Sequence, residues 1–317
     1  MHQNPEISIV IPLFNEQAVF PLLLERLQKV MDQCPHSCEV VMVDDGSRDE
    51  TPELIARAAI SDKRFRGVLL SRNFGHQIAL SAGMAHARCE TAMMVIDGDL
   101  QDPPELLTSF YNELRKGADV VYAVRKNRKE GAFKNSLYWI FYRMLSRLSE
   151  HPIPVDSGDF CMVSKRVLNH MNEMPERSRF IRGIRSWVGF KQVPFEYDRA
   201  GRAEGQTKYS FKSLFKLAYD GIFNFSNKPL KLITHIGLYT ILVSMVYLTG
   251  VLIKKLMGYE VPSGFISLVA VVTLFSGVQL ISLGIIGEYL ARIYLQVKNR
   301  PLFVVDRLVD HEGSKKA

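Results

Sequence analysis

The chain has 317 residues, of which 47% are hydrophobic and 23% charged, and it carries a formal net charge of +7. This length holds one large domain plus a smaller part. Four cysteines do not make a disulfide framework in a chain of this size, so we expect reduced thiols in a cytoplasmic domain. The N-terminus lacks the basic run and apolar stretch of a signal peptide. The basic surplus beside apolar segments favours anionic head groups or a phosphorylated substrate over nucleic acid.

The first 125 residues alternate short β-rich runs with helical patterns, which is typical of a parallel sheet with crossover helices. Each expected strand is followed directly by polar or charged residues. In open α/β sheets ligands bind at the carboxyl ends of the strands, so these residues predict one shared site. The expected strands are Ile7–Leu13, Val40–Val43, Gly67–Leu70, Thr91–Ile96 and Val120–Val124.

Two later segments, 137–148 and 211–225, carry apolar residues at helical spacing with lysines and arginines outside the apolar stripe. Such stripes usually face a protein core. Aromatic-rich and basic as they are here, next to long apolar stretches, they are also candidates for helices that lie in a membrane interface.

Two stretches, Leu232–Ile253 and Ser263–Gly287, contain no Asp, Glu, Lys or Arg. About twenty apolar residues cross the hydrocarbon core of a bilayer, so we expect two transmembrane helices. The alternative is a pair of buried helices in a soluble core.

Lysines and arginines near the outer ends of the pair outnumber Lys254 and Lys255 at the turn. The positive-inside bias therefore predicts a catalytic domain on the cytoplasmic side. We divide the chain into a core (1–131), an acceptor-side segment with amphipathic helices (132–229), a transmembrane hairpin (230–292) and a cytoplasmic tail with a short strand (293–317).

The strongest single motif is Asp97-Gly98-Asp99-Leu100-Gln101, at the end of the fourth expected strand. Mg²⁺ and Mn²⁺ take oxygen ligands and commonly bind through one or two carboxylates plus substrate phosphates. A nucleotide sugar needs such a metal because its diphosphate develops charge as the sugar departs. Surface loops contain Asp-x-Asp by chance, but its place after an apolar strand favours a functional site.

The second expected strand ends in Asp44-Asp45-Gly46-Ser47. Asp45 could accept hydrogen bonds from a base N–H or from ribose hydroxyls. The alternative is a helix N-cap, with Ser47 or Asp49 starting a helix at Glu50. Both roles are compatible because they use different atoms.

Two basic groups flank the amphipathic segments. An arginine fork beside an interfacial helix matches a phosphate head group, whereas a basic run alone is usually a solvated face. We expect an acceptor phosphate to bind Arg125, Arg128, Arg199, Arg202 and Lys208.

Asp156 and Asp159 lie in an expected loop where an acceptor could approach the donor. Sugar transfer to an alcohol requires a base. A phosphate monoester, however, is largely dianionic at neutral pH and has little proton to lose. We therefore hypothesise that Asp159 mainly positions the acceptor, with base catalysis secondary.

Together these residues resemble the family 2 glycosyltransferases of GT-A fold, and within them the polyprenyl-phosphate glycosyltransferases. That group includes dolichol-phosphate mannose synthase and the bactoprenol glucosyltransferases of O-antigen modification. The resemblance spans nearly the whole chain. Its most specific motifs are Arg72-Asn73-Phe74-Gly75, Leu100-Gln101-Asp102-Pro103, Gly158-Asp159-Phe160, Gly277-Val278-Gln279-Leu280 and Gly287-Glu288-Tyr289.

The resemblance implies a site for each substrate. A metal would be held by Asp97, Asp99 and Gln101, and Gly205–Tyr209 would lie near the lipid phosphate. The catalytic carboxylate would be Asp159, with Asp156 ranked below it. The nucleotide sugar would contact Pro12, Phe14, Glu16, Asp45, Asn73 and Asp97.

The resemblance also implies inverting transfer of glucose from UDP-glucose to undecaprenyl phosphate at a bacterial inner membrane, for cell-envelope glycan modification. The identity of the sugar stays open, with aminoarabinose, GlcNAc or mannose as alternatives to glucose. It implies a tetramer, in which a strand at Leu302–Val305 pairs with a neighbouring subunit. A processive polysaccharide synthase would carry a Gln-x-x-Arg-Trp motif and more spans. A non-catalytic nucleotide-sensing scaffold would be expected to have a damaged metal motif.

Overall fold

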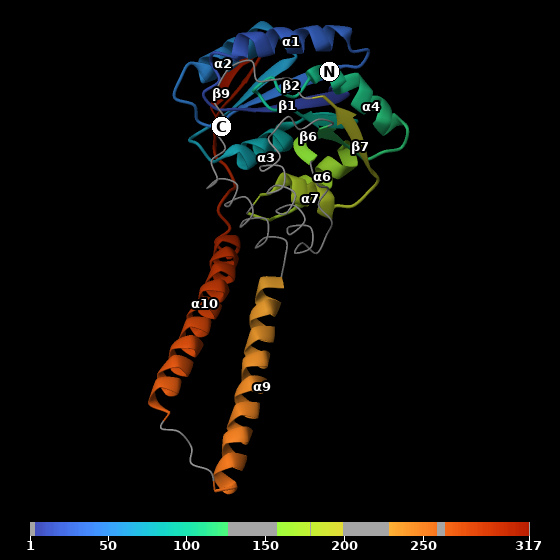
Figure 1. The fold of residues 1–317 in the computed structure, drawn as a ribbon. Coiled ribbons are helices and arrows are strands. Elements are labelled where there is room, and N and C mark those ends of the chain that lie inside the picture. The colour runs from blue at the N-terminus through green and yellow to red at the C-terminus, as the bar shows by residue number, and fades with distance from the viewer. Residues whose placement is uncertain (1–3, 126–156, 178, 199–227, 259–263, 317) are drawn as a thin grey trace. The chain divides into compact units, whose positions relative to one another are not determined.

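The computed structural model describes residues 4–125, 157–177, 179–198, 228–258 and 264–316. The chain divides into two compact units. The first comprises Met1–Ala218 and Arg300–Ala317 and holds a large sheet, and the second is Tyr219–Asn299 and holds two long helices (Figure 1). The C-terminal segment belongs to the first unit from Arg300 onwards.

The described part of the first unit forms a nine-stranded mixed sheet in the order β7-β5-β6-β4-β1-β2-β3-β8-β9. Its parallel centre is β4-β1-β2-β3, as the sequence predicts. The strands are β1 (Ile7–Leu13), β2 (Cys38–Asp44), β3 (Phe65–Leu70), β4 (Ala92–Val95), β5 (Val120–Arg125), β6 (Ser157–Ser164), β7 (Gln192–Tyr197), β8 (Val305–Asp310) and β9 (Gly313–Lys316).

Helices cover both faces of this sheet, which explains why β1 is buried at every position. On one face lie α1 (Phe20–Gln33), α2 (Thr51–Ser61), the 3₁₀ turn η1 (Pro104–Leu106) and α4 (Leu107–Arg115). On the other face lie α3 (His76–His86), α6 (Lys165–Glu173) and α7 (Ile181–Trp187) (Figure 1). The α/β prediction is therefore confirmed for this unit.

The expected loop around Asp159 is wrong, because Ser157–Ser164 forms strand β6. The strand is inserted antiparallel between β4 and β5, with Val95 opposite Cys161. Its alternate residues Phe160 and Met162 join the hydrophobic core, and this burial outweighs the loop-like character of Ser-Gly-Asp. The start of β6 therefore lies beside the end of β4.

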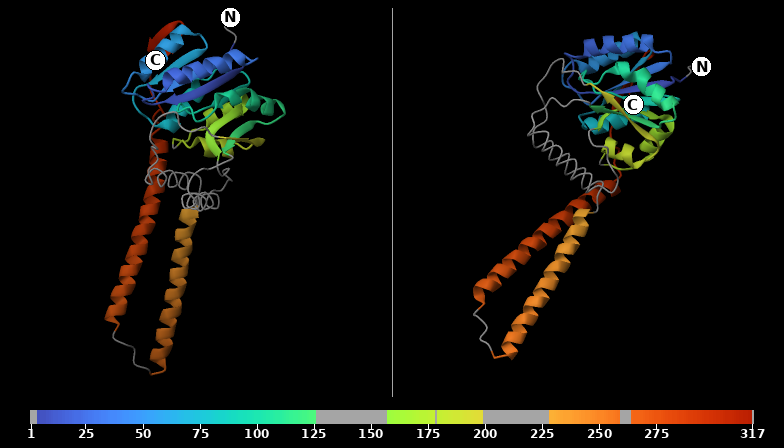
Figure 2. Two further views of the ribbon diagram at one scale, coloured as in Figure 1. Left: turned by 45° about the horizontal axis from the view of Figure 1, so that its top comes forward. Right: turned by 45° about the vertical axis from the view of Figure 1, so that its right-hand side comes forward.

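The predicted C-terminal strand is also placed differently. The strand begins at Val305 and pairs antiparallel with β3 of its own chain. Pairing of the predicted Leu302–Val305 segment with a neighbouring subunit stays a prediction. Val309 is buried against Ala59 and Leu69, so β8 covers an edge of the parallel sheet that would otherwise be open. Figure 2 shows the red C-terminal strand at this edge.

The second unit contains α9 (Lys228–Leu256) and α10 (Phe265–Val297). Within the part of the chain that is described, one stretch, Leu274–Val297, is long and apolar enough to cross a membrane. In α9 the apolar stretch is the shorter Ile233–Tyr247. Two helices are present as predicted, while two spans stay a prediction. The predicted interfacial segments 137–148 and 211–225 lie outside the described residues.

Candidate active site

The loops that follow β1 and β2 are tied together by hydrogen bonds. The Asn15 N–H donates to Ser47 Oγ at 2.9 Å, and the Glu16 N–H donates to Thr51 Oγ1 at 3.0 Å. In return, Asn15 Oδ1 accepts from the Arg48 N–H at 2.9 Å. These bonds satisfy backbone donors in both loops and hold the two strand ends together.

The predicted N-cap is wrong in detail. Helix α2 begins at Thr51, one residue later than expected, and Glu50 at its N-cap makes no side-chain capping bond. Ser47 is engaged by Asn15 instead, while Asp49 accepts from the Thr51 N–H at 3.1 Å. Ser47 therefore helps to join the two loops, and Asp49 stabilises the turn before α2.

The Asp45 carboxylate holds the loop that follows β3. Its two oxygens accept the backbone N–H groups of Phe74 at 2.7 Å and Gly75 at 2.9 Å. Burial raises the pKa of Asp45, and these two hydrogen bonds oppose the rise. A direct bond from Asp45 to ribose or uracil stays a prediction, but loop positioning is a role that the sequence did not suggest.

Gly46 is required where these loops meet. Its φ is +67°, in the left-handed region, and a Cβ there would lie 2.4 Å from the Arg72 carbonyl carbon and 2.5 Å from the Asn73 nitrogen. The backbones after β2 and β3 are thus in direct contact. The other residues predicted to contact the nucleotide lie at the carboxyl ends of β1 and β3. Pro12 is buried in β1, Phe14 is 37% exposed, Glu16 is half-buried and Asn73 is exposed.

Asp97 lies immediately after β4 and carries an unusual oxygen. Its side chain is 31% exposed, yet its Oδ1 atom is buried and has no hydrogen-bond partner among the described residues. Burial raises the pKa of Asp97, while the charge of His76 acts in the opposite direction. Buried carboxylate oxygens are normally hydrogen-bonded, so this one is a candidate ligand position.

The rest of the predicted metal motif, Gly98–Gln101, forms a sharp turn directly after Asp97 in the chain. Asp99 Oδ1 accepts the Gln101 N–H at 3.1 Å, and Leu100 between them has φ +59°. Gln101 is buried. A left-handed leucine is costly, and such strain concentrates at functional sites.

The donor set fits a hard divalent cation. No group of three His, Cys, Asp and Glu side chains in the described residues is arranged to hold a metal. The predicted set, however, has two carboxylates and one amide. Mg²⁺ and Mn²⁺ sites of this kind complete their oxygen ligands with substrate phosphates and water. The unsatisfied Oδ1 of Asp97 is the observation that favours such an ion.

Asp159 is brought to this place by the antiparallel strand β6. It is buried, and its carboxylate meets three side chains: Arg182 Nε donates to Oδ1 at 2.9 Å, Gln77 Nε2 donates to Oδ2 at 3.0 Å, and His76 Nε2 lies 3.4 Å from Oδ2. We call Asp159, His76, Gln77 and Arg182 the Asp159 cluster. His76 Nε2 also lies 3.7 Å from Asp97 Oδ1 and so links the cluster to the predicted metal site.

The charges of the Asp159 cluster support one another. Burial alone would raise the pKa of Asp159, but the charges and hydrogen bonds of Arg182 and His76 hold it well below its usual range. Desolvation opposes the charged imidazole, yet the hydrogen bond to Asp159 and the charge of Asp97 raise the pKa of His76 to about 9. The cluster therefore contains one carboxylate and two cations at neutral pH.

Sequence reasoning missed the three partners of Asp159. His76 and Gln77 follow Arg72-Asn73-Phe74-Gly75 directly, so their position after a strand end was an available signal. Arg182 had no local signal, because its contact with Asp159 depends on the packing of α7 against β6.

The predicted acceptor-side residues lie mostly outside the described part of the chain. Arg125 ends β5, where it pairs through its backbone with Tyr197. The others lie outside the described residues: Asp156, Arg128, Arg199, Arg202 and Lys208.

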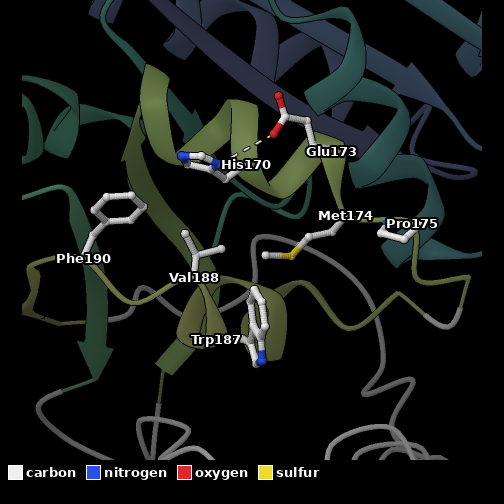
Figure 3. Close-up of a pocket in the computed structure, with 7 residues that line it drawn as sticks. All are labelled: His170, Glu173, Met174, Pro175, Trp187, Val188 and Phe190. Carbon is white, nitrogen blue, oxygen red and sulfur yellow. Dashed lines mark ion pairs between the residues drawn. The ribbon is translucent and has the colours of Figure 1, made fainter.

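A cavity of about 370 Å³ lies between the end of α6 and the end of α7 (Figure 3). Met174, Pro175, Trp187, Val188 and Phe190 give it an apolar lining. His170 and Glu173 form an ion pair of 3.6 Å beside it. None of its lining residues belongs to the predicted site.

Comparison with known proteins places this geometry in a family. Residues 8–171 match the model described as glycosyl transferase family 2, and residues 228–293 match the model described as GtrB C-terminal hairpin. The uncharacterized glycosyltransferase YkcC of Bacillus subtilis (strain 168) is 43% identical over 99% of this chain and 98% of its own length. The SfII prophage-derived bactoprenol glucosyl transferase of Shigella flexneri is 36% identical over 98% of this chain and 99% of its own length.

Among solved structures, the mannosyltransferase PcManGT from Pyrobaculum calidifontis, in complex with GDP-Man and Mn²⁺, is a distant likeness. It is 15% identical, has a TM-score of 0.49, and the match covers 95% of this chain and 89% of that one. The family assignment depends instead on the matched models and the full-length relatives. By these, this chain belongs to glycosyl transferase family 2, has the GT-A fold and is a glycosyltransferase.

Proposed function

We propose that this enzyme transfers a single sugar from a UDP-sugar to a polyprenyl phosphate, with inversion at the sugar. Glucose and undecaprenyl phosphate are the first candidates. The observation that carries the proposal is the 36% identity, over nearly the full length of both chains, to a protein named as a bactoprenol glucosyl transferase. Another UDP- or GDP-sugar, such as aminoarabinose, GlcNAc or mannose, is the nearest alternative.

The donor half of the proposal uses the ends of β1, β2, β3 and β4. The exposed ring of Phe14 and the loop held by Asp45 would receive the nucleotide, with Pro12, Glu16 and Asn73 beside them. Asp97, Asp99 and Gln101 would hold Mg²⁺ or Mn²⁺. When bound, the cation supplies positive charge for the departing diphosphate.

The acceptor half uses Asp159 and the basic residues. The strongly lowered pKa of Asp159 makes it a weak base. A phosphate acceptor needs no strong base, because it is largely dianionic at neutral pH. Asp159 would therefore position the acceptor, with the phosphate bound by Arg125, Arg128, Arg199, Arg202 and Lys208.

For the membrane, we propose that α9 and α10 form a two-span hairpin in a bacterial inner membrane. The apolar stretches Leu274–Val297 and Ile233–Tyr247 support this. Lys228 and Lys231 at one outer end, and Lys298 and Arg300 at the other, favour a cytoplasmic catalytic unit. A homotetramer is the expected assembly by family resemblance, and cross-linking in native membranes tests it.

The test is an incubation of membranes with labelled UDP- and GDP-sugars and undecaprenyl phosphate, with and without EDTA. We expect a chloroform-soluble labelled product, formed from UDP-glucose and only with a divalent cation. A product from a different donor would correct the sugar. The absence of product with every donor would favour a non-catalytic nucleotide-sensing scaffold.

A further inference from the structure

Both oxygens of the Asp159 carboxylate are held by residues from two different helices. Arg182 of α7 reaches Oδ1 through Nε at 2.9 Å and Oδ2 through its second nitrogen, Nη2, at 3.3 Å. Gln77 of α3 donates to Oδ2 at 3.0 Å. The carboxylate is only 4% exposed, so it has little freedom to rotate or to exchange these partners for water.

Gln77 also fixes the helix that carries Arg182. Its Oε1 accepts the Ile181 N–H, at the start of α7, at 2.8 Å. One amide therefore joins α3, α7 and β6 at a single point, and both of its polar atoms are used. Arg182 follows Ile181 directly, so movement of Gln77 would disturb both contacts to Asp159.

Helix α7 is anchored again one turn further on. Arg185 is fully buried, and its Nη1 donates to the Gly158 carbonyl, in the residue before Asp159, at 3.3 Å. Its carbonyl accepts from Gln192 Nε2 at 3.0 Å. These bonds fix α7 against β6 and β7, so the Arg182 guanidinium is aimed by a rigid element rather than by a loop.

The negative charges around the site explain why the Asp159 carboxylate needs to be paired and held in place. The reaction brings an acceptor phosphate toward Asp159 and Asp97, both of which are acidic. Like charges at close range repel strongly where water is excluded. A carboxylate that is paired with Arg182 presents much less negative charge to an incoming anion than an unpaired one.

We propose that Arg182 and Gln77 are positioning residues of the transfer reaction. Together they fix the Asp159 carboxylate by both oxygens, and Arg182 also neutralises its charge so that the acceptor phosphate can approach. This inference rests on the proposed function. It assigns neither residue a direct contact with substrate.

The test measures initial rates of the full-length enzyme in proteoliposomes with UDP-glucose, Mn²⁺ and undecaprenyl phosphate. Arg182→Ala should lower kcat/KM for the acceptor about 100-fold, since a small displacement of a catalytic group has effects of this size. The KM for UDP-glucose should stay unchanged. Arg182→Lys should be intermediate, and added guanidinium should partly restore the alanine variant.

Gln77→Glu separates the two bonds of Gln77. A glutamate can still accept the Ile181 N–H, but it places a second negative charge beside Asp159. We expect loss of acceptor kcat/KM and a lower thermal unfolding temperature, because two carboxylates would then repel each other in a buried site. Matched controls are Arg64→Ala, which removes another half-buried arginine paired with carboxylates, and Asn172→Ala, which removes an amide that joins α6 to α3 at Met84. Both should keep wild-type kinetics.

The decisive comparison repeats Arg182→Ala in an Asp159→Asn background. If Arg182 acts through Asp159, its removal should lower acceptor kcat/KM very little once the carboxylate is gone. The double variant should therefore match Asp159→Asn alone. An equal loss in both backgrounds would mean that Arg182 acts independently, and would overturn the inference. So would wild-type kinetics in the Arg182 and Gln77 variants. If the wild-type enzyme transfers no sugar to a lipid phosphate, the proposed function fails, and the inference falls with it.

Discussion

The ends of β2 and β4 are both acidic and lie at the same edge of one sheet, but their carboxylates are used differently. Asp44 accepts the N–H groups of Gly46 and Ser47, and Asp45 accepts those of Phe74 and Gly75. Asp97 keeps a buried oxygen with no hydrogen-bond partner in the described part of the chain. The carboxylates of Asp44 and Asp45 shape loops, whereas we propose that Asp97 offers its oxygen to a ligand. The difference lies in the use of each oxygen, since the two motifs look alike in sequence.

The largest effect is expected from Asp97→Asn. Loss of the carboxylate should reduce sugar transfer roughly a thousandfold, as removal of a group that stabilises developing charge does. The thermal unfolding temperature should change little. The variant no longer buries an anionic oxygen without a hydrogen bond, but it also loses the ion pair of Asp97 with His76. Rates and unfolding temperatures of purified enzyme check both. Near-normal transfer by this variant would remove the distinction between the two strand ends.

Gly46→Ala should cost about 3 kcal/mol of stability, because the added Cβ meets backbone atoms at a left-handed φ. Gly117→Ala is the matched control. Its φ is +94°, but nothing lies within 4 Å of the added Cβ, so it should cost only about 1 kcal/mol. Equal shifts in thermal unfolding would mean that the contact between the loops contributes nothing.

Asp45→Asn should lower the free energy of unfolding by about 2 kcal/mol, because the amide leaves one of two backbone N–H groups without an acceptor. Affinity for UDP should fall only as far as the loop is disturbed. Thermal unfolding and UDP titration separate the two effects. A large loss of UDP affinity at unchanged stability would instead favour direct contact between Asp45 and the nucleotide.

The smallest effect is expected from Ser47→Ala. The variant removes the acceptor for the exposed Asn15 N–H and the hydroxyl that donates to Asp44, but Asp44 keeps the backbone N–H groups of Gly46 and Ser47. We expect about 0.5 kcal/mol of lost stability and unchanged transfer. A loss as large as that of Asp45→Asn would show that a single exposed bond holds the two loops.

The sequence was sufficient for the parts of the fold that repeat a local pattern. Four of the five predicted β-rich runs form the parallel centre, and β1 was bounded correctly at Ile7 and Leu13. The position of the Asp97–Gln101 motif directly after a strand was predicted for the same reason. Its unsatisfied oxygen was not, because hydrogen-bond use depends on neighbours far along the chain.

The parts that the sequence did not predict depend on long-range packing. Strand β6 was taken for a loop because its first residues are small and polar, and its antiparallel insertion follows from burial of Phe160 and Met162. Gln77 and Asp159 are 82 residues apart, so no local spacing predicts their contact. The C-terminal strand lies a few residues later than predicted, because Val309 fills an edge that only the folded sheet creates.

The contrast between the two strand ends is tested most directly by Mn²⁺ binding, measured by electron paramagnetic resonance at saturating UDP. Wild-type enzyme and the Asp45→Asn variant should both bind the ion, because Asp45 acts on loop structure. The Asp97→Asn variant should not bind it. Wild-type Mn²⁺ affinity in Asp97→Asn, or its loss in a folded, UDP-saturated Asp45→Asn variant, would contradict the roles assigned to the two acids.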